Sequence, residues 1–137
     1  MNDKRGSLTT ITGAKQALNA IEYVRYATGK QRLEGQQIGF MLLLSTAPED
    51  GMNMQTVSNK LDVDHSFVSR NTKAFGPQMM DEPVVFQRID ASSPKFRLIG
   101  LTDHGLKIVH NYIGINKGEV KFNARTGAVT KVKLDKK

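Results

Sequence analysis

One helical segment of the sequence presents side chains that could contact a nucleic acid. The segment reads NKLDVDHSFVSRNTKAF, residues 59–75, and a helix is expected over residues 65–75 after an acidic turn. Val68, Thr72 and Phe75 fall on the core face of this helix. The outward or helix-start side chains are His65, Ser66, Phe67, Ser69, Arg70 and Lys73, of which Phe67 could instead belong to the core. Serine and arginine can bind base edges or phosphates, lysine can bind phosphates, and phenylalanine can touch a thymine methyl group. A helix with this outer face is suited to the major groove of DNA.

Other kinds of chemistry find little support in the sequence. Asp62 and Asp64 could be offered as metal ligands, but a helix cap and a turn explain them, and no third carboxylate is spaced nearby. His65, His104 and His110 are not at metal-ligand spacing, and no Ser/His/Asp order indicates a triad beyond chance. The chain has no cysteine, which excludes a thiolate nucleophile and a disulfide. We therefore expect no metal, no cofactor and no enzymatic activity.

The elements that would position the helix follow a defined order. Apolar spacing and capping residues predict four helices before any strand, over residues 12–28, 36–45, 54–61 and 65–75. A β-hairpin follows, with strands at residues 84–89 and 95–99. Thr102 caps a fifth helix with core positions Leu106, Val109, Tyr112 and Ile113 and a stop at Gly114. This order predicts a mainly α fold with a small β component (α+β), a winged helix-turn-helix.

The last part of the chain changes to a period of two. Between residues 120 and 134, one predicted face is apolar, with Val120, Phe122, Ala124, Ala128, Thr130, Val132 and Leu134. The other face is polar and mostly cationic, with Lys121, Asn123, Arg125, Lys131 and Lys133. Gly127 suits the turn between them. The tail is therefore predicted to be a second β-hairpin whose cations add affinity for DNA without sequence preference.

Length and charge agree with a single compact domain that has a basic tail. The chain has 137 residues, of which 39% are hydrophobic, and a net charge of +7. Residues 117–137 hold seven basic and two acidic residues, so they carry +5 of this charge and favour a polyanionic partner. The predicted organisation is a flexible N-terminus at 1–11, a winged helix-turn-helix domain at 12–116 and a basic hairpin at 117–137. The longest apolar run, residues 38–44, is too short to span a bilayer, so we expect a cytoplasmic protein without a membrane partner.

Two separated motifs resemble a known family. VSNKL at 57–61, Val63 and SFVSR at 66–70 are similar to the helix-turn-helix of MarR-type winged-helix transcriptional regulators. Downstream, RID at 88–90 and RLIGLTDHG at 97–105 resemble that family's wing and its Leu-Thr-x-x-Gly helix start. The resemblance covers about residues 36–113. Asn71, at a position that is usually apolar in the family, and Pro94, near its usual acidic-x-basic pair, depart from the pattern.

The resemblance implies a sequence-specific binder of double-stranded DNA. Helix 65–75 would enter the major groove and the wing, residues 84–99, would reach the adjacent minor groove. Ser66, Phe67, Ser69 and Arg70 fall on base-reading or phosphate-contacting positions. The wing cations of the candidate site are Arg88, Lys95 and Arg97. The family usually continues into a long C-terminal helix that helps to form a dimer, whereas this chain continues into the basic hairpin.

Two questions stay open at the level of the sequence. The alternative to a DNA-binding regulator is a winged-helix module that docks on another protein of a transcription or replication complex. A homodimer is expected through one face of the first helix, which carries Ala14, Leu18 and Ile21. No small-molecule effector is predicted.

Overall fold

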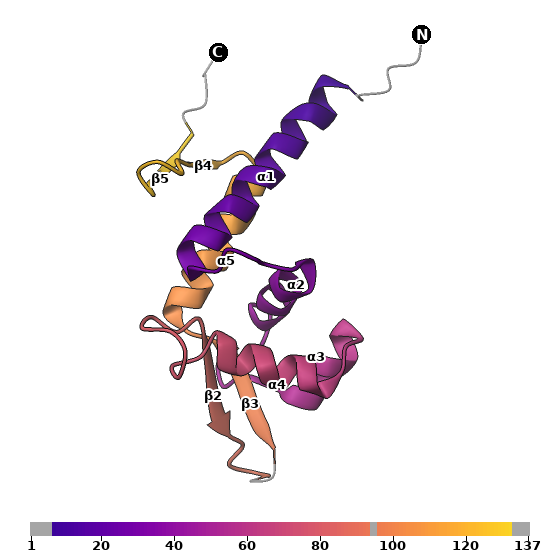
Figure 1. Cartoon of the computed structure of the whole chain (residues 1–137). Coiled ribbons are helices and arrows are strands. Elements are labelled where there is room, and N and C mark those ends of the chain that lie inside the picture. Colours follow the sequence, from indigo (N-terminus) through magenta and orange to yellow (C-terminus); the bar gives the residue numbers. More distant parts are fainter. Residues whose placement is uncertain (1–6, 94–95, 133–137) are drawn as a thin grey trace. The chain divides into compact units, whose positions relative to one another are not determined.

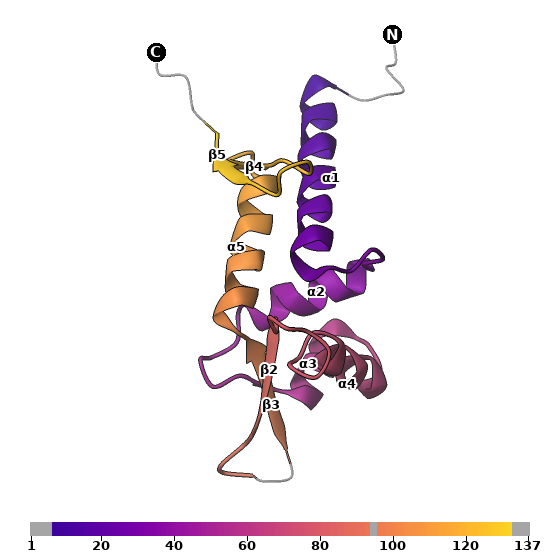
Figure 2. The ribbon, with the colours of Figure 1, turned by 60° about the vertical axis from the view of Figure 1, so that its left-hand side comes forward.

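The computed structural model of the chain describes residues 7–93 and 96–132. These residues form five helices and five strands (Figures 1 and 2). They divide into two compact units. The central unit covers residues 32–109, and the terminal unit combines the described residues up to 31 with those from 110 onward. The first helix thus groups with the C-terminal hairpin, whereas the sequence placed it in the same domain as the helix-turn-helix.

The central unit surrounds a small antiparallel sheet. Its helices are α2 (Gly35–Leu44), α3 (Met54–Leu61), α4 (His65–Ala74) and the first part of α5 (Asp103–Asn116). Its strands are β1 (Met52–Asn53), β2 (Val85–Ile89) and β3 (Arg97–Leu101), in the spatial order β1-β3-β2. In the β2–β3 register, Val85 pairs with Leu101 and Ile89 with Arg97. The return strand therefore lies two residues later than the predicted 95–99.

Apolar side chains from every helix and from β2 and β3 form the core of the central unit. Phe40 and Phe75 are fully buried and stack with ring centroids 6.5 Å apart. Other fully buried members are Met41, Val57, Val68, Val84, Val85, Ile99 and Ile108. The nearly all-apolar sequence of α2 is explained by its place at this core.

Helix caps confirm part of the prediction. The side chain of Asn53 accepts a hydrogen bond from the Gln55 amide at 2.7 Å, so α3 begins where expected. Asp64 stands at the N-cap of α4, but its side chain makes no capping hydrogen bond, so that predicted bond is wrong.

The terminal unit is built on the 21-residue helix α1 (Leu8–Thr28), with the end of α5 and the hairpin strands β4 (Val120–Phe122) and β5 (Val129–Lys131). The side chain of Ser7 accepts a hydrogen bond from the Thr10 amide, which caps α1 four residues before the predicted start. The expected flexible segment 1–11 is therefore helical from Leu8. No helix in the described ranges is long and apolar enough to cross a membrane.

The buried face of α5 differs from the predicted one. Thr102 caps the helix as expected, since its hydroxyl accepts a hydrogen bond from the Gly105 amide at 3.0 Å. Val109 is buried as predicted, together with Ile108 and Ile115, whereas Leu106 and Ile113 are 45% and 40% exposed. Gly105 explains the shift, because it packs against the Val84 carbonyl and so turns its own side of the helix inward. The helix also continues through Gly114 to Asn116.

The C-terminal hairpin packs on α1 of its own chain. The Phe122 ring lies between those of Tyr23 and Tyr26, at centroid distances of 5.5 and 5.3 Å. The Asn19 side chain donates to the Phe122 carbonyl at 3.0 Å and accepts from the Phe122 amide at 3.1 Å. The Asn19 side-chain amide thus bonds the Phe122 backbone as a neighbouring strand would. It satisfies the backbone hydrogen-bonding groups of Phe122 at the outer edge of β4.

The register of the hairpin overturns the predicted division into apolar and cationic faces. Phe122 pairs with Val129, Lys121 with Thr130, and Val120 with Lys131. Directly paired residues share a face, so even-numbered positions of β4 share a face with odd-numbered positions of β5. Thr130 therefore lies on the face of Lys121, and Lys131 lies on the face of Val120. The prediction assumed the same parity in both strands, which this turn length does not allow. Leu134 and Lys133 lie outside the described residues.

Candidate nucleic-acid interface

The turn between α3 and α4 is fixed by Ser58, a residue that the sequence did not single out. Its buried hydroxyl donates to the Val63 carbonyl at 2.6 Å, and the Val63 amide donates to the Ser58 carbonyl at 3.1 Å. Between them, Asp62 adopts a left-handed conformation with φ 54°. Aspartate tolerates this conformation better than most residues do. The two helices of the helix-turn-helix are thereby held at a defined angle.

The inner face of α4 is anchored by two contacts with α2. Phe67 is only 7% exposed, and its ring meets that of Phe40 edge to face at 6.3 Å. The buried Asn71 side chain donates to the Phe67 carbonyl and accepts from Gln37, both at 2.9 Å. The prediction that Phe67 points outward is therefore wrong. The inner stripe is wider than the expected Val68, Thr72 and Phe75, because Asn71 satisfies its polar groups and lets the neighbouring turn be buried.

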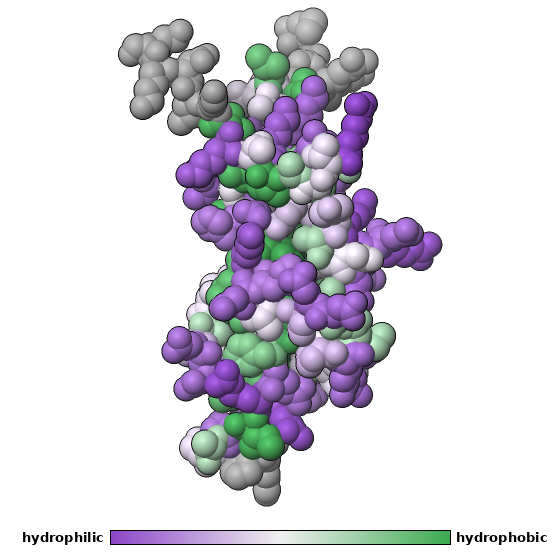
Figure 3. Space-filling model, turned by 90° about the vertical axis from the view of Figure 1, so that its left-hand side faces the viewer, coloured by the Kyte–Doolittle hydropathy of each residue, from purple (hydrophilic) through white to green (hydrophobic). Residues whose placement is uncertain are grey.

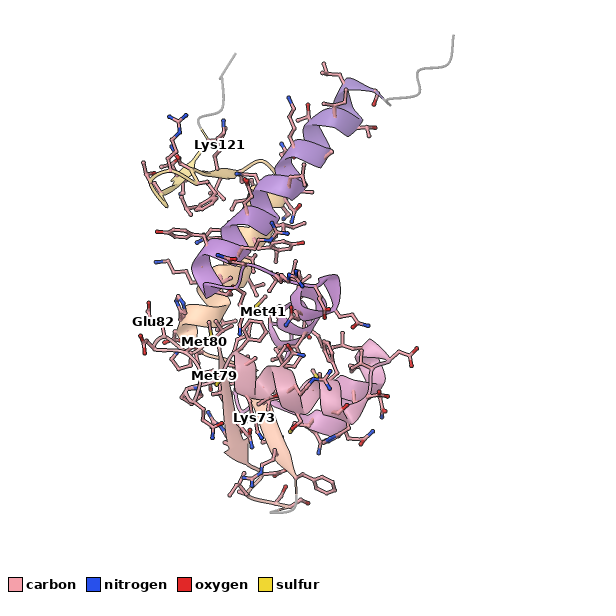
Figure 4. The ribbon with its side chains drawn as sticks, in the orientation of Figure 1. Met41, Lys73, Met79, Met80, Glu82 and Lys121 are labelled. Atoms are coloured by element: carbon pink, nitrogen blue, oxygen red, sulfur yellow. The ribbon has the colours of Figure 1, made fainter. Side chains whose placement is uncertain are left out.

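The outer face of α4 keeps the remaining predicted side chains. His65, Ser66, Arg70 and Lys73 are exposed and Ser69 is half-buried. Ser66, Arg70 and Lys73 stand four and three residues apart, so they form one stripe along the helix. Neither Arg70 nor Lys73 forms an ion pair with any residue that the structure describes. The stripe thus offers two uncompensated cations and a hydroxyl; Figure 4 labels Lys73.

The wing adds a groove beside the C-terminal end of α4. Side chains alternate along a strand, and in β2 and β3 the residues Gln87, Ile89 and Arg97 lie on the side of the sheet that faces Lys73. Together with Thr72 and Gln78 they line a groove of about 500 Å³. The groove has the cations Arg97 and Lys73 at its border, so it is suited to an anionic ligand such as a phosphate.

Arg88 also lines this groove, but its guanidinium contacts residues on the opposite face of the strand. Its guanidinium carbon is 4.6 Å from the centroid of the Phe86 ring. Its Nη1 is 3.6 Å from Oδ1 of Asp50, in the loop before β1. Of the three predicted wing cations, Arg97 and Arg88 both line the groove, the Arg88 guanidinium pairs with Asp50, and Lys95 lies outside the described residues.

The tip of the wing is shaped by Asp90. Its carboxylate accepts hydrogen bonds from the Ser92 hydroxyl at 2.8 Å and the Ser92 amide at 3.0 Å. The side-chain and backbone hydrogen bonds from Ser92 lower the pKa of Asp90 below its ordinary value. Two large apolar side chains that flank this turn are exposed to solvent, Ile89 at 56% and Phe96 at 49%. Neither was predicted as a site residue.

Comparison with known proteins places this geometry in a fold. No protein-family model matches the sequence, and no curated protein matches it. Solved structures of a Staphylococcus aureus protein, MepR, do match. A MepR–DNA complex aligns with a TM-score of 0.65 and 17% identity, over 80% of this chain and 82% of the other. A second structure shows MepR, described as a transcription regulator of the multidrug efflux pump MepA. It aligns with a TM-score of 0.57 and 17% identity, over 80% of this chain and 74% of the other. MepR bound to ethidium bromide aligns with a TM-score of 0.58 and 15% identity, over 84% and 79%.

MepR is a MarR-family regulator. The present chain has a MarR-type winged-helix fold. This confirms the α+β winged helix-turn-helix that was predicted from the sequence. Within the fold, α3 and α4 are the helix-turn-helix and β2–β3 is the wing.

The tail cations of the winged-helix chain belong to the terminal unit. Lys121, Arg125 and Lys131 are exposed, and Lys121 is labelled in Figure 4. Lys121 and Lys131 stand on opposite faces of the hairpin and Arg125 lies in its turn. They therefore do not form the single cationic strip that was expected, and Lys133 lies outside the described residues.

Some residues of the winged-helix interface were missed although a signal existed. Alternation along residues 85–89 would have placed Gln87 and Ile89 together, opposite Arg88. Gln78, in the loop after α4, carries no pattern that separates it from other loop residues. Among the described residues, no group of three histidine, aspartate or glutamate side chains could hold a metal ion.

Proposed function

We propose that this protein is a sequence-specific binder of double-stranded DNA that acts as a transcriptional regulator in the cytoplasm. Helix α4 enters the major groove, and the β2–β3 wing reaches the adjacent minor groove. The observation that carries the proposal is the outer stripe of α4, where Ser66, Arg70 and Lys73 are free of internal partners among the described residues. The solved MepR–DNA complex, which has the same fold, supports it. Regulation would follow from occupancy of the site, without chemistry.

The proposed roles divide between recognition and positioning. Arg70 lies near the middle of the outer stripe, and an arginine there can make a bidentate contact with guanine. Lys73, together with Arg97 across the groove, would hold backbone phosphates, which fix the register of the protein but carry no sequence information. Lys121, Arg125 and Lys131 would contribute only general attraction to DNA, because they belong to the separate terminal unit.

We also propose that two copies bind together through α1. Leu8, Ile11 and Leu18 are 79%, 38% and 64% exposed, and helical spacing places them on one stripe with Lys15 and Glu22. A groove of about 800 Å³ adjoins the stripe, with Ile21, Ile115, Val120 and Val132 among its lining residues. Antiparallel pairing of two α1 helices about Leu18 would bring Lys15 next to Glu22 of the partner subunit. A second copy would thus cover apolar surface and pair opposite charges. Figure 3 shows one face of the molecule, which is mostly hydrophilic with smaller hydrophobic areas between the hydrophilic residues.

The experiment that tests the proposal is selection of bound sequences from a random duplex pool. A conserved consensus is expected, and a palindrome would show that two copies bind side by side. An unenriched pool would reject sequence-specific recognition. The alternative function, a winged-helix module that docks on another protein of a transcription or replication complex, predicts that unenriched result.

A further inference from the structure

Arg88 differs from the other exposed cations of the candidate interface because it is already paired. Its Nη1 lies 3.6 Å from Oδ1 of Asp50, whereas Arg70, Lys73 and Arg97 form no ion pair with any described residue. We propose that Asp50 is a built-in competitor of DNA phosphate for Arg88, and that it thereby lowers the affinity of the wing for duplex DNA. This inference rests on the proposed function, because it names a further residue that sets the strength of the same interaction.

Backbone packing holds Asp50 in place beside the wing. The Gly51 amide donates to the Pro48 carbonyl at 2.8 Å, which closes a tight turn. Gly51 has φ +107°, and a Cβ at this position would lie 2.9 Å from the Ile99 carbonyl oxygen. Only glycine fits such a conformation and such a close approach. The next residue, Met52, then pairs with Ile99 in the sheet. Asp50 is therefore fixed two residues before the start of β1, which is an edge strand of the sheet.

The position of Arg88 is fixed by the residue below it. Phe86 pairs with Gly100, and a Cβ at Gly100 would lie only 2.6 Å from the Phe86 ring. The ring thus lies against the bare backbone of Gly100 and offers its other side to Arg88, whose guanidinium carbon is 4.6 Å from the ring centroid. An arginine over an aromatic ring is attracted to its face. Stacking on Phe86 and the alternation of side chains along β2 together direct the guanidinium toward Asp50.

The exposure of the pair sets the size of the effect. The side chains of Arg88 and Asp50 are 51% and 81% exposed, and ion pairs of this kind contribute roughly 0.2–1 kcal/mol. The pair therefore stabilises the fold very little, and either side chain can be changed without unfolding. A phosphate that approaches Arg88 must displace the Asp50 carboxylate or tolerate its charge nearby. Removal of that carboxylate should raise the affinity by the corresponding factor, about 1.4- to 5-fold.

The test measures duplex binding of the full chain against salt for a set of matched variants. Asp50→Asn should bind duplex DNA about 1.4- to 5-fold more tightly than the parent, with a steeper salt dependence, because Arg88 is then free to neutralise a phosphate. Asp50→Glu keeps a carboxylate at this position and should therefore bind duplex DNA with the parental affinity. Arg88→Gln should weaken binding, and Asp50→Asn should have a much smaller effect in the Arg88→Gln background. Glu49→Gln removes the adjacent carboxylate, which pairs with no described residue, and is the control for general charge.

Two outcomes would overturn the inference while the proposed function stands. In the first, Asp50→Asn binds no more tightly than the parent or than Glu49→Gln. In the second, its gain is unchanged in the Arg88→Gln background. Lys73→Gln distinguishes failure of the Asp50 proposal from failure of the proposed DNA-binding function. If α4 contacts DNA, Lys73→Gln should weaken duplex binding whatever the result for Asp50. A parent protein that binds no duplex DNA at low salt would reject both proposals. Thermal unfolding monitored by circular dichroism should be nearly the same for all variants.

Discussion

At the scale of single residues, Arg70 is expected to carry sequence preference. It is exposed on the outer stripe of α4 and unpaired among the described residues. Arg70→Ala should weaken binding to the selected sequence by about 1–3 kcal/mol and relax preference at one base pair, because a bidentate contact to guanine is lost. Competition binding against single-base variants of the site would measure this. Equal affinities of variant and parent for every sequence would remove Arg70 from the interface.

Lys73 should behave differently from Arg70, since it borders the groove between α4 and the wing. Lys73→Ala should weaken binding to all duplexes about equally and flatten the slope of log affinity against log salt by about 0.9. Fluorescence anisotropy at several salt concentrations would measure the slope. A change confined to one sequence would instead indicate a base contact.

Phe67 tests the corrected orientation of α4. Its ring is buried against Phe40, so Phe67→Ala should destabilise the central unit by about 3–5 kcal/mol, from lost burial and the cavity that remains. Urea unfolding would measure this. Phe96→Ala is a suitable control, because Phe96 is 49% exposed and its loss should cost far less. Parental stability of Phe67→Ala together with weakened DNA binding would support the original outward orientation.

At the scale of elements, local sequence patterns correctly predicted those helices and strands whose bounds depend on their own residues. The bounds of α3 follow from Asn53 and from the apolar positions Met54, Val57 and Leu61. The winged-helix order follows from the same kind of pattern. Errors arose where contacts with another element determined which residues are buried. Gly105 turns α5 against Val84. On α4, Phe67 packs against Phe40 and Asn71 accepts from Gln37, and both partners belong to α2. The apolar spacing of a single helix does not reveal which residues of other elements it will contact.

The C-terminal hairpin is expected to depend on its attachment to α1. Asn19 makes two hydrogen bonds to the Phe122 backbone, and Asn19→Ala would leave both backbone groups without a protein partner. The variant should exchange the Phe122 amide proton much faster than the parent in hydrogen-exchange experiments. Thr9→Ala, at an exposed position of the same helix, is the control. Unchanged protection of Phe122 in Asn19→Ala would contradict the packing of the hairpin on α1.

The same attachment buries an ionisable side chain. Tyr23 is 6% exposed, and burial raises its pKa, although the hydrogen bond from Asn111 acts in the opposite direction. The contacts of Phe122 with Tyr23 and Tyr26 attach the hairpin to α1 of its own chain. No pattern within residues 120–134 could have named these partners, because they lie about a hundred residues away.

At the scale of the whole molecule, the exposed stripe of α1 predicts self-association. Leu18→Glu should shift a dimer toward monomer, because it places a charge at the centre of the proposed helix pair. Sedimentation velocity at micromolar concentration would measure this. Lys107→Glu, at an exposed position of α5 in the central unit, is the control. A parent protein that sediments as a monomer both alone and with duplex DNA would reject the α1 dimer.

The central claim concerns the partner itself: a polyanionic duplex bound by α4 and the wing. The most direct test is the affinity of the full chain for duplex DNA as a function of salt. Each neutralised phosphate releases counterions and adds about −0.9 to the slope of log affinity against log salt. Phosphate contacts from Lys73 and Arg97 therefore predict a slope of about −1.8 or steeper. A flat response with negligible affinity at low salt would contradict the account and would favour a module that docks on another protein.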